Sequence, residues 1–369
     1  MTEAASGTPV RLHSLTGLRW IAAFVVFGFH IDQLKISDNA VYSEIVRVLF
    51  WPGTVGVPFF FLLSGLVLTW SAKAGDRPSS FWRRRVARVY PNHVVTWIVV
   101  AIGLTVLSSE AAPNAGQVIS GLFLVQAWIP DFDYVFGVNT PAWSLSAEAV
   151  FYASFPLLLP LLKRVRRMWI AAAGLLAAIW ALPLLFLVMP HDPAYYLVWV
   201  LPFSRMLEFA LGMAVALMIQ RGTWRGPGLL VSGAIALGAY LTVPLLQEWG
   251  YVAWTVGPFA LLLAAAAQAD IKQTPSVMRR PWLVFLGEIS FAFYLVHQFV
   301  IRFVVKVTGT GISVGLAIGV FVVSLAVSML LSWALFRVVE KPMERFIRTY
   351  RTKKQRAADA EEPAPVTAS

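Results

Sequence analysis

Apolar runs of about 20 residues recur along the whole chain and constrain its fold more than any other feature. Wound as an α-helix, a run of this length crosses the hydrocarbon core of a bilayer. Because only helices and closed barrels satisfy the backbone in lipid, the runs predict an all-α, polytopic membrane protein with about ten transmembrane helices. The ten runs lie at 14–34, 54–73, 89–109, 141–162, 168–189, 199–219, 228–246, 251–269, 283–305 and 313–336.

The composition requires the same environment. Hydrophobic residues make up 58% of the chain and charged residues 13%, whereas ordinary soluble domains carry about 25% charged residues. Soluble, fibrous and disordered classes are therefore excluded. The chain has no cysteine, which rules out disulfides and thiolate nucleophiles, and its five histidines are dispersed. We therefore predict no metal site.

Lysine and arginine fall mainly in alternate connecting segments. With the N-terminus inside, 24 of the 30 basic residues lie in inside segments, three in outside segments and three within the runs. Because these residues accumulate on the cytoplasmic side, the count predicts that both termini are cytoplasmic. It also explains the net charge of +11 as a consequence of topology. We therefore expect the lipid bilayer, and no nucleic acid, as a partner.

The runs divide the chain into three parts. Residues 1–13 form a cytoplasmic segment, 14–336 form the ten-helix membrane domain, and 337–369 form a basic, largely disordered cytoplasmic tail. The apolar stretch 115–129 is too short to span a bilayer, so we interpret it as interfacial or re-entrant.

Two ionisable residues share the first predicted span. Such side chains cost at least about 2.5 kcal/mol near the bilayer centre and are usually functional or paired. Arg19 and His30 are separated by about three helical turns, which places them on one face about 16 Å apart. Arg19 could simply extend to the membrane surface, and His30 could be a packed core residue. Alternatively, a neutral His30 is suited to act as a general base.

Later segments carry further polar groups. Arg85 and Arg88 could share one helical face and bind phosphate, although basic residues here also serve as topology signals. Glu148 lies within a span and needs an Arg or His partner from a neighbouring helix. Arg205 and Glu208, three residues apart, are interpreted as a local ion pair.

The ninth predicted span carries three polar side chains at helical spacing. Ser290, Tyr294 and His297 follow one another by steps of four and three residues, so they share one face. That face could line a polar cavity. Glu288 lies close to the cytoplasmic end of the span, where contact with water is the simpler interpretation.

Six short motifs occur in order along the chain. They are Leu15-Thr16-Gly17-Leu18-Arg19 with His30, Gly56 to Gly65, Arg85 to Pro91, Trp143 to Tyr152, Leu286 to His297, and Val339-Glu340-Lys341-Pro342. Together they resemble the acyltransferase-3 family of multi-pass membrane O-acyltransferases over about residues 11–348. The chain resembles the stand-alone form, without a hydrolase-like domain. It departs from many members at Pro58 and Ala149, where they carry acidic residues, which limits inference about the acceptor.

The resemblance implies transfer of an acyl group, expected to be acetyl, from acyl-CoA to a hydroxyl. The expected acceptor contains sugar, as a cell-surface glycan or a secondary metabolite such as a macrolide. Acyl-CoA is then a donor substrate, with no permanently bound cofactor, and we expect a multi-pass protein of the bacterial inner membrane.

The resemblance also implies roles for individual residues. His30 is expected to act as general base, although a covalent acyl-histidine is an alternative. Arg19 would contact CoA or stabilise negative charge, and Glu148 would orient His30 or an arginine. The remaining expected sites are Arg85 and Arg88 for the CoA phosphates, and Ser290, Tyr294 and His297 along the acceptor path.

A secondary transporter is the competing class. Transporters that export a sugar or an acylated intermediate also have about ten spans and charged groups near the midplane. The sequence shows no clear pair of matching halves, which disfavours this class. A structural scaffold would not need so many polar groups within its spans.

Overall fold

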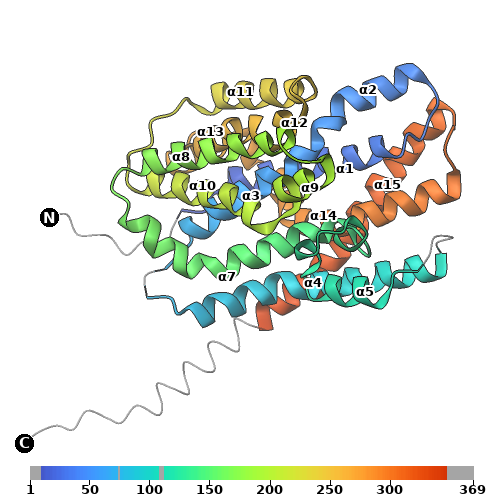
Figure 1. Ribbon diagram of the computed structural model, residues 1–369, viewed down its shortest axis with the longest axis horizontal. Coiled ribbons are helices and arrows are strands. Elements are labelled where there is room, and N and C mark those ends of the chain that lie inside the picture. The colour runs from blue at the N-terminus through green and yellow to red at the C-terminus, as the bar shows by residue number, and fades with distance from the viewer. Residues whose placement is uncertain (1–9, 74, 108–111, 347–369) are drawn as a thin grey trace, which may run out of the picture.

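The structure, a computed structural model, describes residues 10–73, 75–107 and 112–346, and these contain no strand. Most of the long helices run roughly along the longest axis of the molecule (Figure 1). The helices are α1 (His13–Gln33), α2 (Ala40–Phe50), α3 (Gly56–Trp70), α4 (Pro78–Leu107), α5 (Ala115–Leu122), α6 (Phe132–Val135), α7 (Trp143–Arg164), α8 (Met168–Ala181), α9 (His191–Tyr195), α10 (Pro202–Gln220), α11 (Leu229–Thr242), α12 (Gln247–Trp249), α13 (Val256–Ile271), α14 (Pro281–Thr308) and α15 (Val314–Leu335).

The prediction of an all-α polytopic membrane protein is confirmed. Nine helical segments of the described residues are long and apolar enough to cross a membrane. The predicted run 228–246 forms a shorter apolar helix, Leu229–Leu245, which includes α11. The α-helix gives way to a 3₁₀ turn that contains Pro244, because proline cannot donate the next helical hydrogen bond.

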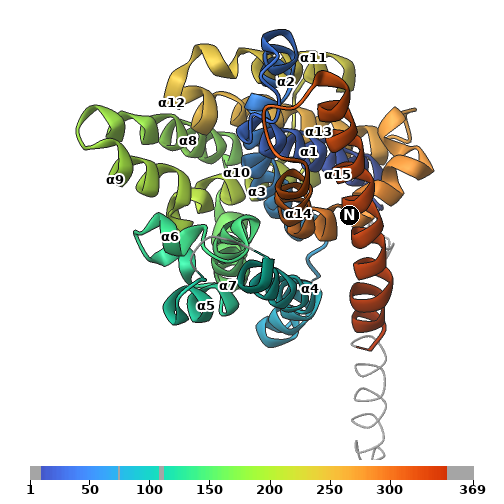
Figure 2. The same cartoon turned by 90° about the vertical axis from the view of Figure 1, so that its right-hand side faces the viewer.

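The helices at the centre of the bundle pack through glycine. Figure 2 shows α1, α3, α10 and α14 near the middle, with α4, α8 and α15 at the rim. A Cβ atom added to Gly65 of α3 would lie 1.9 Å from the carbonyl oxygen of Phe209 on α10. Reciprocally, a Cβ at Gly212 would lie 2.0 Å from the carbonyl oxygen of Leu62. Small residues are what allow membrane helices to approach this closely.

A similar contact joins α1 to α14, the two helices that carry most of the predicted site residues. A Cβ at Gly287 would lie 1.8 Å from the carbonyl oxygen of Thr16. Arg19 lies one helical turn beyond Thr16, and Ser290 lies one turn beyond Gly287. The close approach therefore fixes these two polar side chains near one another.

The stretch 115–129, predicted to be interfacial or re-entrant, forms α5 followed by a turn. Asn114 and Gln117 cap α5 reciprocally. The turn is held against α7, because the Ser146 hydroxyl donates to the carbonyl oxygen of Leu124 at 2.6 Å and the Gln126 amide donates to that of Ala142 at 3.0 Å. These bonds satisfy non-helical backbone that would otherwise be costly to bury.

Segments that the charge count assigns to the inside lie together at one end of the molecule. Arg221, after α10, donates to the carbonyl oxygens of Lys163, in the last turn of α7, and of Val165, just after α7, at 2.8 and 2.6 Å. The cytoplasmic location of this end stays a prediction. The predicted tail begins as helix, which continues through residues 337–346, and its remainder, 347–369, lies outside the described residues, as do residues 1–9 of the N-terminal segment.

Candidate active site

Three cavities follow one another through the bundle and contain most of the predicted site residues. We name them the basic cavity, the neck and the histidine cavity. Arg19 lines both the basic cavity and the neck, and Tyr294 lines both the neck and the histidine cavity. The shared residues place the cavities end to end. The prediction that Arg19 and His30 lie on one face of the first span is confirmed, because both face this series.

The basic cavity has a volume of about 650 Å³ and lies where α1 and α14 begin and α3 ends. Its wall includes Arg19 and Arg88. Glu288, which was predicted to contact water, is exposed and lines the same cavity. Basic side chains outnumber acidic ones, so the cavity suits a ligand with several negative charges. The basic residues are Arg11, Arg19, Lys73, Arg88 and Lys341, and the acidic residues are Glu288, Glu340 and Glu344.

Glu340 is a site residue that the sequence interpretation did not single out. It ends a π-helical turn, Phe336–Glu340, and is 4% exposed. The Asn92 amide of α4 donates to its carboxylate at 2.9 Å. Because these residues are 248 positions apart, no spacing in the sequence could have paired them. The motif that contains Glu340 was the signal available.

The neck is the narrowest part of the series, with a volume of about 60 Å³. Glu148 and Arg19 both line it, so Glu148 lies nearer to the arginine than to His30, which lines the next cavity. The Tyr152 hydroxyl donates to Glu148 at 2.5 Å. Ser290 also lines the neck, with its hydroxyl donating to the carbonyl oxygen of Gly287 at 2.8 Å.

The histidine cavity, of about 280 Å³, contains His30. The Nδ1 atom of His30 lies 3.0 Å from Oε1 of Gln33, one helical turn later. With that oxygen as acceptor, Nδ1 carries the hydrogen and Nε2 keeps a lone pair for a substrate. Tyr294 lines the same cavity, and its hydroxyl lies 3.0 Å from that of Ser144.

His297 lies behind His30 rather than in the cavity wall. Its side chain is fully buried, and the two imidazole rings have centroids 5.1 Å apart. Nδ1 lies 2.8 Å from the carbonyl oxygen of Tyr294 and 3.2 Å from that of Phe293. Because carbonyl oxygens only accept, Nδ1 donates and Nε2 is an acceptor, which has no hydrogen-bond partner within the described chain.

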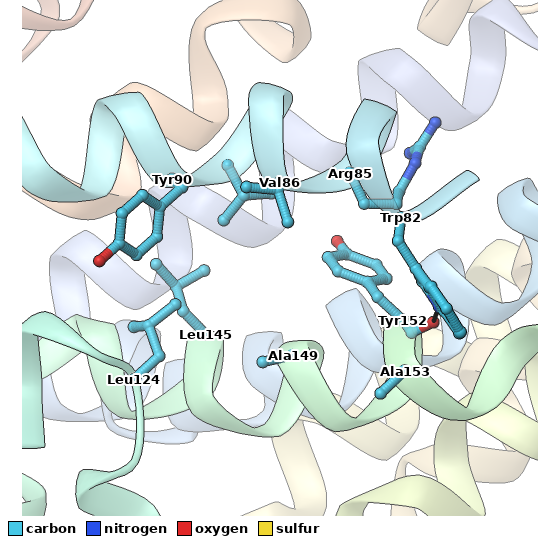
Figure 3. Close-up of a pocket in the computed structure, with 10 residues that line it drawn as sticks. Trp82, Arg85, Val86, Tyr90, Leu124, Leu145, Ala149, Tyr152 and Ala153 are labelled. Atoms are coloured by element: carbon cyan, nitrogen blue, oxygen red, sulfur yellow. Dashed lines mark hydrogen bonds between the residues drawn. The ribbon is translucent and has the colours of Figure 1, made fainter. Parts of the chain in front are cut away.

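Arg85 and Arg88 line different cavities, although they were predicted to share one face. Arg88 faces the basic cavity, whereas Arg85 lines a separate cleft of about 390 Å³ between α4 and α7. In Figure 3 the guanidinium group of Arg85 points away from the space between the two helices. It lies 5.7 Å from the ring of Phe81. The two arginine side chains are therefore only three residues apart on α4 but point into different spaces.

The predicted ion pair between Arg205 and Glu208 is confirmed. The guanidinium and carboxylate groups lie 2.9 Å apart, and both side chains are fully buried. Arg205 also donates to the carbonyl oxygen of Val198 and lies 5.4 Å from the ring of Trp199. Because Trp199 lines the histidine cavity, the pair supports its wall.

Within the described residues, no group of three or more histidine, aspartate or glutamate side chains is placed to hold a metal ion. The series of cavities instead offers a polyanion site at one end and an imidazole lone pair near the other. Such an arrangement suits two substrates that approach from opposite directions and react between the ends.

Comparison with known proteins decides the class of reaction. A family model described as an acyltransferase domain matches residues 12–337. The chain belongs to this acyltransferase family. The match covers the membrane domain and confirms the resemblance drawn from the six motifs.

The chain is similar to proteins from several bacteria, including the three that follow. Acyltransferase MdmB of Streptomyces mycarofaciens is 41% identical over 81% of this chain and 81% of its own. The exopolysaccharide production protein ExoZ of Rhizobium meliloti is 29% identical over 69% and 78%. The peptidoglycan O-acetyltransferase OatA of Listeria monocytogenes is 26% identical over 80% of this chain and 50% of its own. No solved structure matches the chain.

Proposed function

We propose that this acyltransferase moves an acyl group from acyl-CoA to a hydroxyl of a sugar-containing acceptor, with His30 as general base. One observation carries the proposal. A cavity rich in basic residues is linked through a narrow neck to a cavity that holds an imidazole with a free lone pair. A bacterial inner membrane location follows from the same proposal, with the basic cavity open to the cytoplasm.

The donor would bind with its phosphates in the basic cavity. Charge-assisted hydrogen bonds from Arg88 and the neighbouring lysines would hold these phosphates. The pantetheine arm is long and thin, so it suits a neck of about 60 Å³. Arg19 has no hydrogen bond or ion pair within the described part of the chain and lines the neck. It is therefore available to the thioester or to the CoA phosphates.

The chemistry balances without a bound cofactor. Nε2 of His30 would take the proton from the acceptor hydroxyl, whose oxygen attacks the thioester carbon. The carbon–sulfur bond then breaks, and the thiolate of CoA receives the proton from His30. Arg19 and the Tyr294 hydroxyl would stabilise the negative charge that develops on the carbonyl oxygen.

The acceptor would approach from the opposite end, through the histidine cavity. Gln33, Gln298 and Arg302 line it together with His30, and such groups bind hydroxyls and ring oxygens of sugars. The printed names of ExoZ and OatA refer to exopolysaccharide and peptidoglycan, which supports a sugar-containing acceptor. The placement of His297 behind His30 makes it a support for that ring in this proposal.

In the decisive experiment, membranes that contain the protein are incubated with radiolabelled acetyl-CoA and an extract of the host cells, which supplies the acceptor. A labelled product whose label is released by mild alkali, as an ester is, supports the proposal. The matched control is the His30→Gln protein in the same membranes. Transport of a solute without any labelled product would overturn the proposal and favour a transporter.

A further inference from the structure

The cleft between α4 and α7 is not part of the cavity series. Figure 3 shows Val86 and Tyr90 of α4 on one side, and Leu145 and Ala149 of α7 on the other. Its volume of about 390 Å³ exceeds that of the neck and the histidine cavity. The lining residues are Trp82, Arg85, Val86, Val89, Tyr90, Leu124, Leu145, Ala149, Tyr152 and Ala153.

The cleft opens onto the lipid-facing surface. The side chain of Val86 is 59% exposed and that of Trp82 is 42% exposed, and Ala149 and Ala153 are exposed as well. The two alanines lie one helical turn apart, so their small side chains leave a hollow along α7. The outer side of the cleft is therefore bounded by lipid in a membrane.

The inner side of the cleft lies one side chain away from the proposed path of the thioester. Leu145 lines both the cleft and the neck. Leu145 also packs in one apolar cluster with Tyr294 and Val26, which line the histidine cavity, and with Leu124 at the inner end of the cleft. A chain that leaves the neck past Leu145 would enter the cleft.

The chemistry of the lining selects an aliphatic occupant. The guanidinium group of Arg85 points away from the space between the helices, so it offers no partner to a phosphate there (Figure 3). The Tyr152 hydroxyl is already engaged with Glu148. What remains is apolar surface, which suits a hydrocarbon chain and disfavours a charged head group.

We propose that the α4/α7 cleft binds the acyl chain of donors longer than acetyl. The inference rests on the proposed function, because it places the thioester in the neck. At about 30 Å³ for each non-hydrogen atom, an acetyl group fills on the order of 100 Å³. The cleft has room for a chain of roughly ten carbons, so the protein accepts acyl-CoA donors over a range of chain lengths.

The test measures binding rather than turnover. In a competition assay, unlabelled acetyl-, butyryl- and hexanoyl-CoA are each titrated against radiolabelled acetyl-CoA bound to the protein in phospholipid nanodiscs. The affinity should rise about fourfold for each added methylene, which corresponds to about 0.8 kcal/mol. Ala149→Phe and Ala153→Phe fill the hollow, so they should remove this increase and leave acetyl-CoA binding within about twofold of the original.

Ala178→Phe is the matched control, because Ala178 is an exposed alanine of α8 that lines none of these cavities. It should keep the full dependence on chain length. If acetyl-CoA binds but longer donors bind no tighter, or if the α7 variants keep the increase, the inference is overturned.

Two further outcomes separate this inference from its premise. If no acyl-CoA binds at all, the proposed function itself fails. If mass spectrometry shows that the α7 variants lose a co-purified phospholipid while their chain-length profile stays unchanged, a bilayer lipid occupies the cleft and the inference is overturned.

Discussion

At the residue scale, His30 and His297 differ in what surrounds their ring nitrogens although their rings lie close together. His30 lines a cavity and keeps Nε2 free, whereas His297 is enclosed and uses Nδ1 to bond the backbone of its own helix. A general base must reach the proton that it removes. We therefore propose His30, and not His297, for that role.

The first prediction concerns His30→Gln. The amide keeps a polar side chain of similar size but cannot take up a proton near neutral pH. Acyl transfer should fall by about 10²–10⁴-fold, the usual contribution of general acid–base catalysis, while acyl-CoA binding is retained. The measurement is the rate of label transfer from acetyl-CoA in membranes with equal amounts of protein.

His297→Asn provides the comparison. An asparagine amide can still donate to the carbonyl oxygens of Phe293 and Tyr294, as Nδ1 does. This variant should keep at least a tenth of the activity. A larger loss in His297→Asn than in His30→Gln would move the role of base to His297.

The second prediction separates Arg88 from Arg85. Arg88 faces the basic cavity and Arg85 does not. Because a charge-assisted hydrogen bond contributes about 1.5–3 kcal/mol, Arg88→Gln should weaken acyl-CoA binding by about 10–150-fold. Arg85→Gln should weaken it by less than about threefold. Titration with CoA measures both, and equal losses would restore the pair as a shared phosphate site.

These residues could be identified from the sequence, but not all of the residues that contact them. Helical spacing correctly placed Arg19 with His30, because both lie on one helix. It also predicted the ion pair of Arg205 with Glu208. It could not find the bond from Asn92 to Glu340 or separate Arg85 from Arg88, because those depend on how α4 is rotated against its neighbours.

At the element scale, the closest contacts between helices occur at glycine residues, which have no side chain to hold the backbones apart. Gly65 and Gly212 let α3 and α10 touch through their backbones. Hydropathy reports the apolar length of a span, so it located most of the helices. It does not report which face packs, so α2, which precedes α3, and the short extent of α11 appeared only in the structure.

The third prediction tests this packing. Gly65→Ala places a Cβ atom against the backbone of α10, so one helix must shift. Overpacking of this kind costs about 1–3 kcal/mol, although alanine alone would favour a helix by about 1 kcal/mol. The melting temperature in detergent should fall.

Gly238→Ala is the control, because a Cβ atom at Gly238 of α11 meets no atom within 4 Å. Its melting temperature should stay the same or rise. A Gly65→Ala protein as stable as this control would show that α3 and α10 have room to separate.

At the scale of the whole molecule, the proposed donor and acceptor sites face opposite ends of the bundle. This arrangement has the proposed function only if the basic cavity opens to the cytoplasm, where acyl-CoA is made. The uneven distribution of lysine and arginine predicts that orientation. The structure places the segments concerned at one end, as Arg221 and Lys163 show.

The fourth prediction tests this orientation with single cysteines in a chain that has none of its own. Asp131→Cys should react with an impermeant thiol reagent in intact cells, because its loop is predicted to lie outside. Lys272→Cys should react only after lysis. The opposite pattern would place the basic cavity outside the cell and exclude cytoplasmic acyl-CoA as the donor.

The narrowness of the neck also matters for the energy supply of the cell. A water-filled passage through the bundle would let protons leak and would discharge the gradient that drives ATP synthesis. Phe60, Phe61 and Phe291 narrow the neck between its polar side chains, and a volume of about 60 Å³ has room for only about two waters. In the proposed function, substrates from the two sides of the bilayer therefore react without a continuous column of water between them, and Phe60→Ala should make membranes measurably permeable to protons.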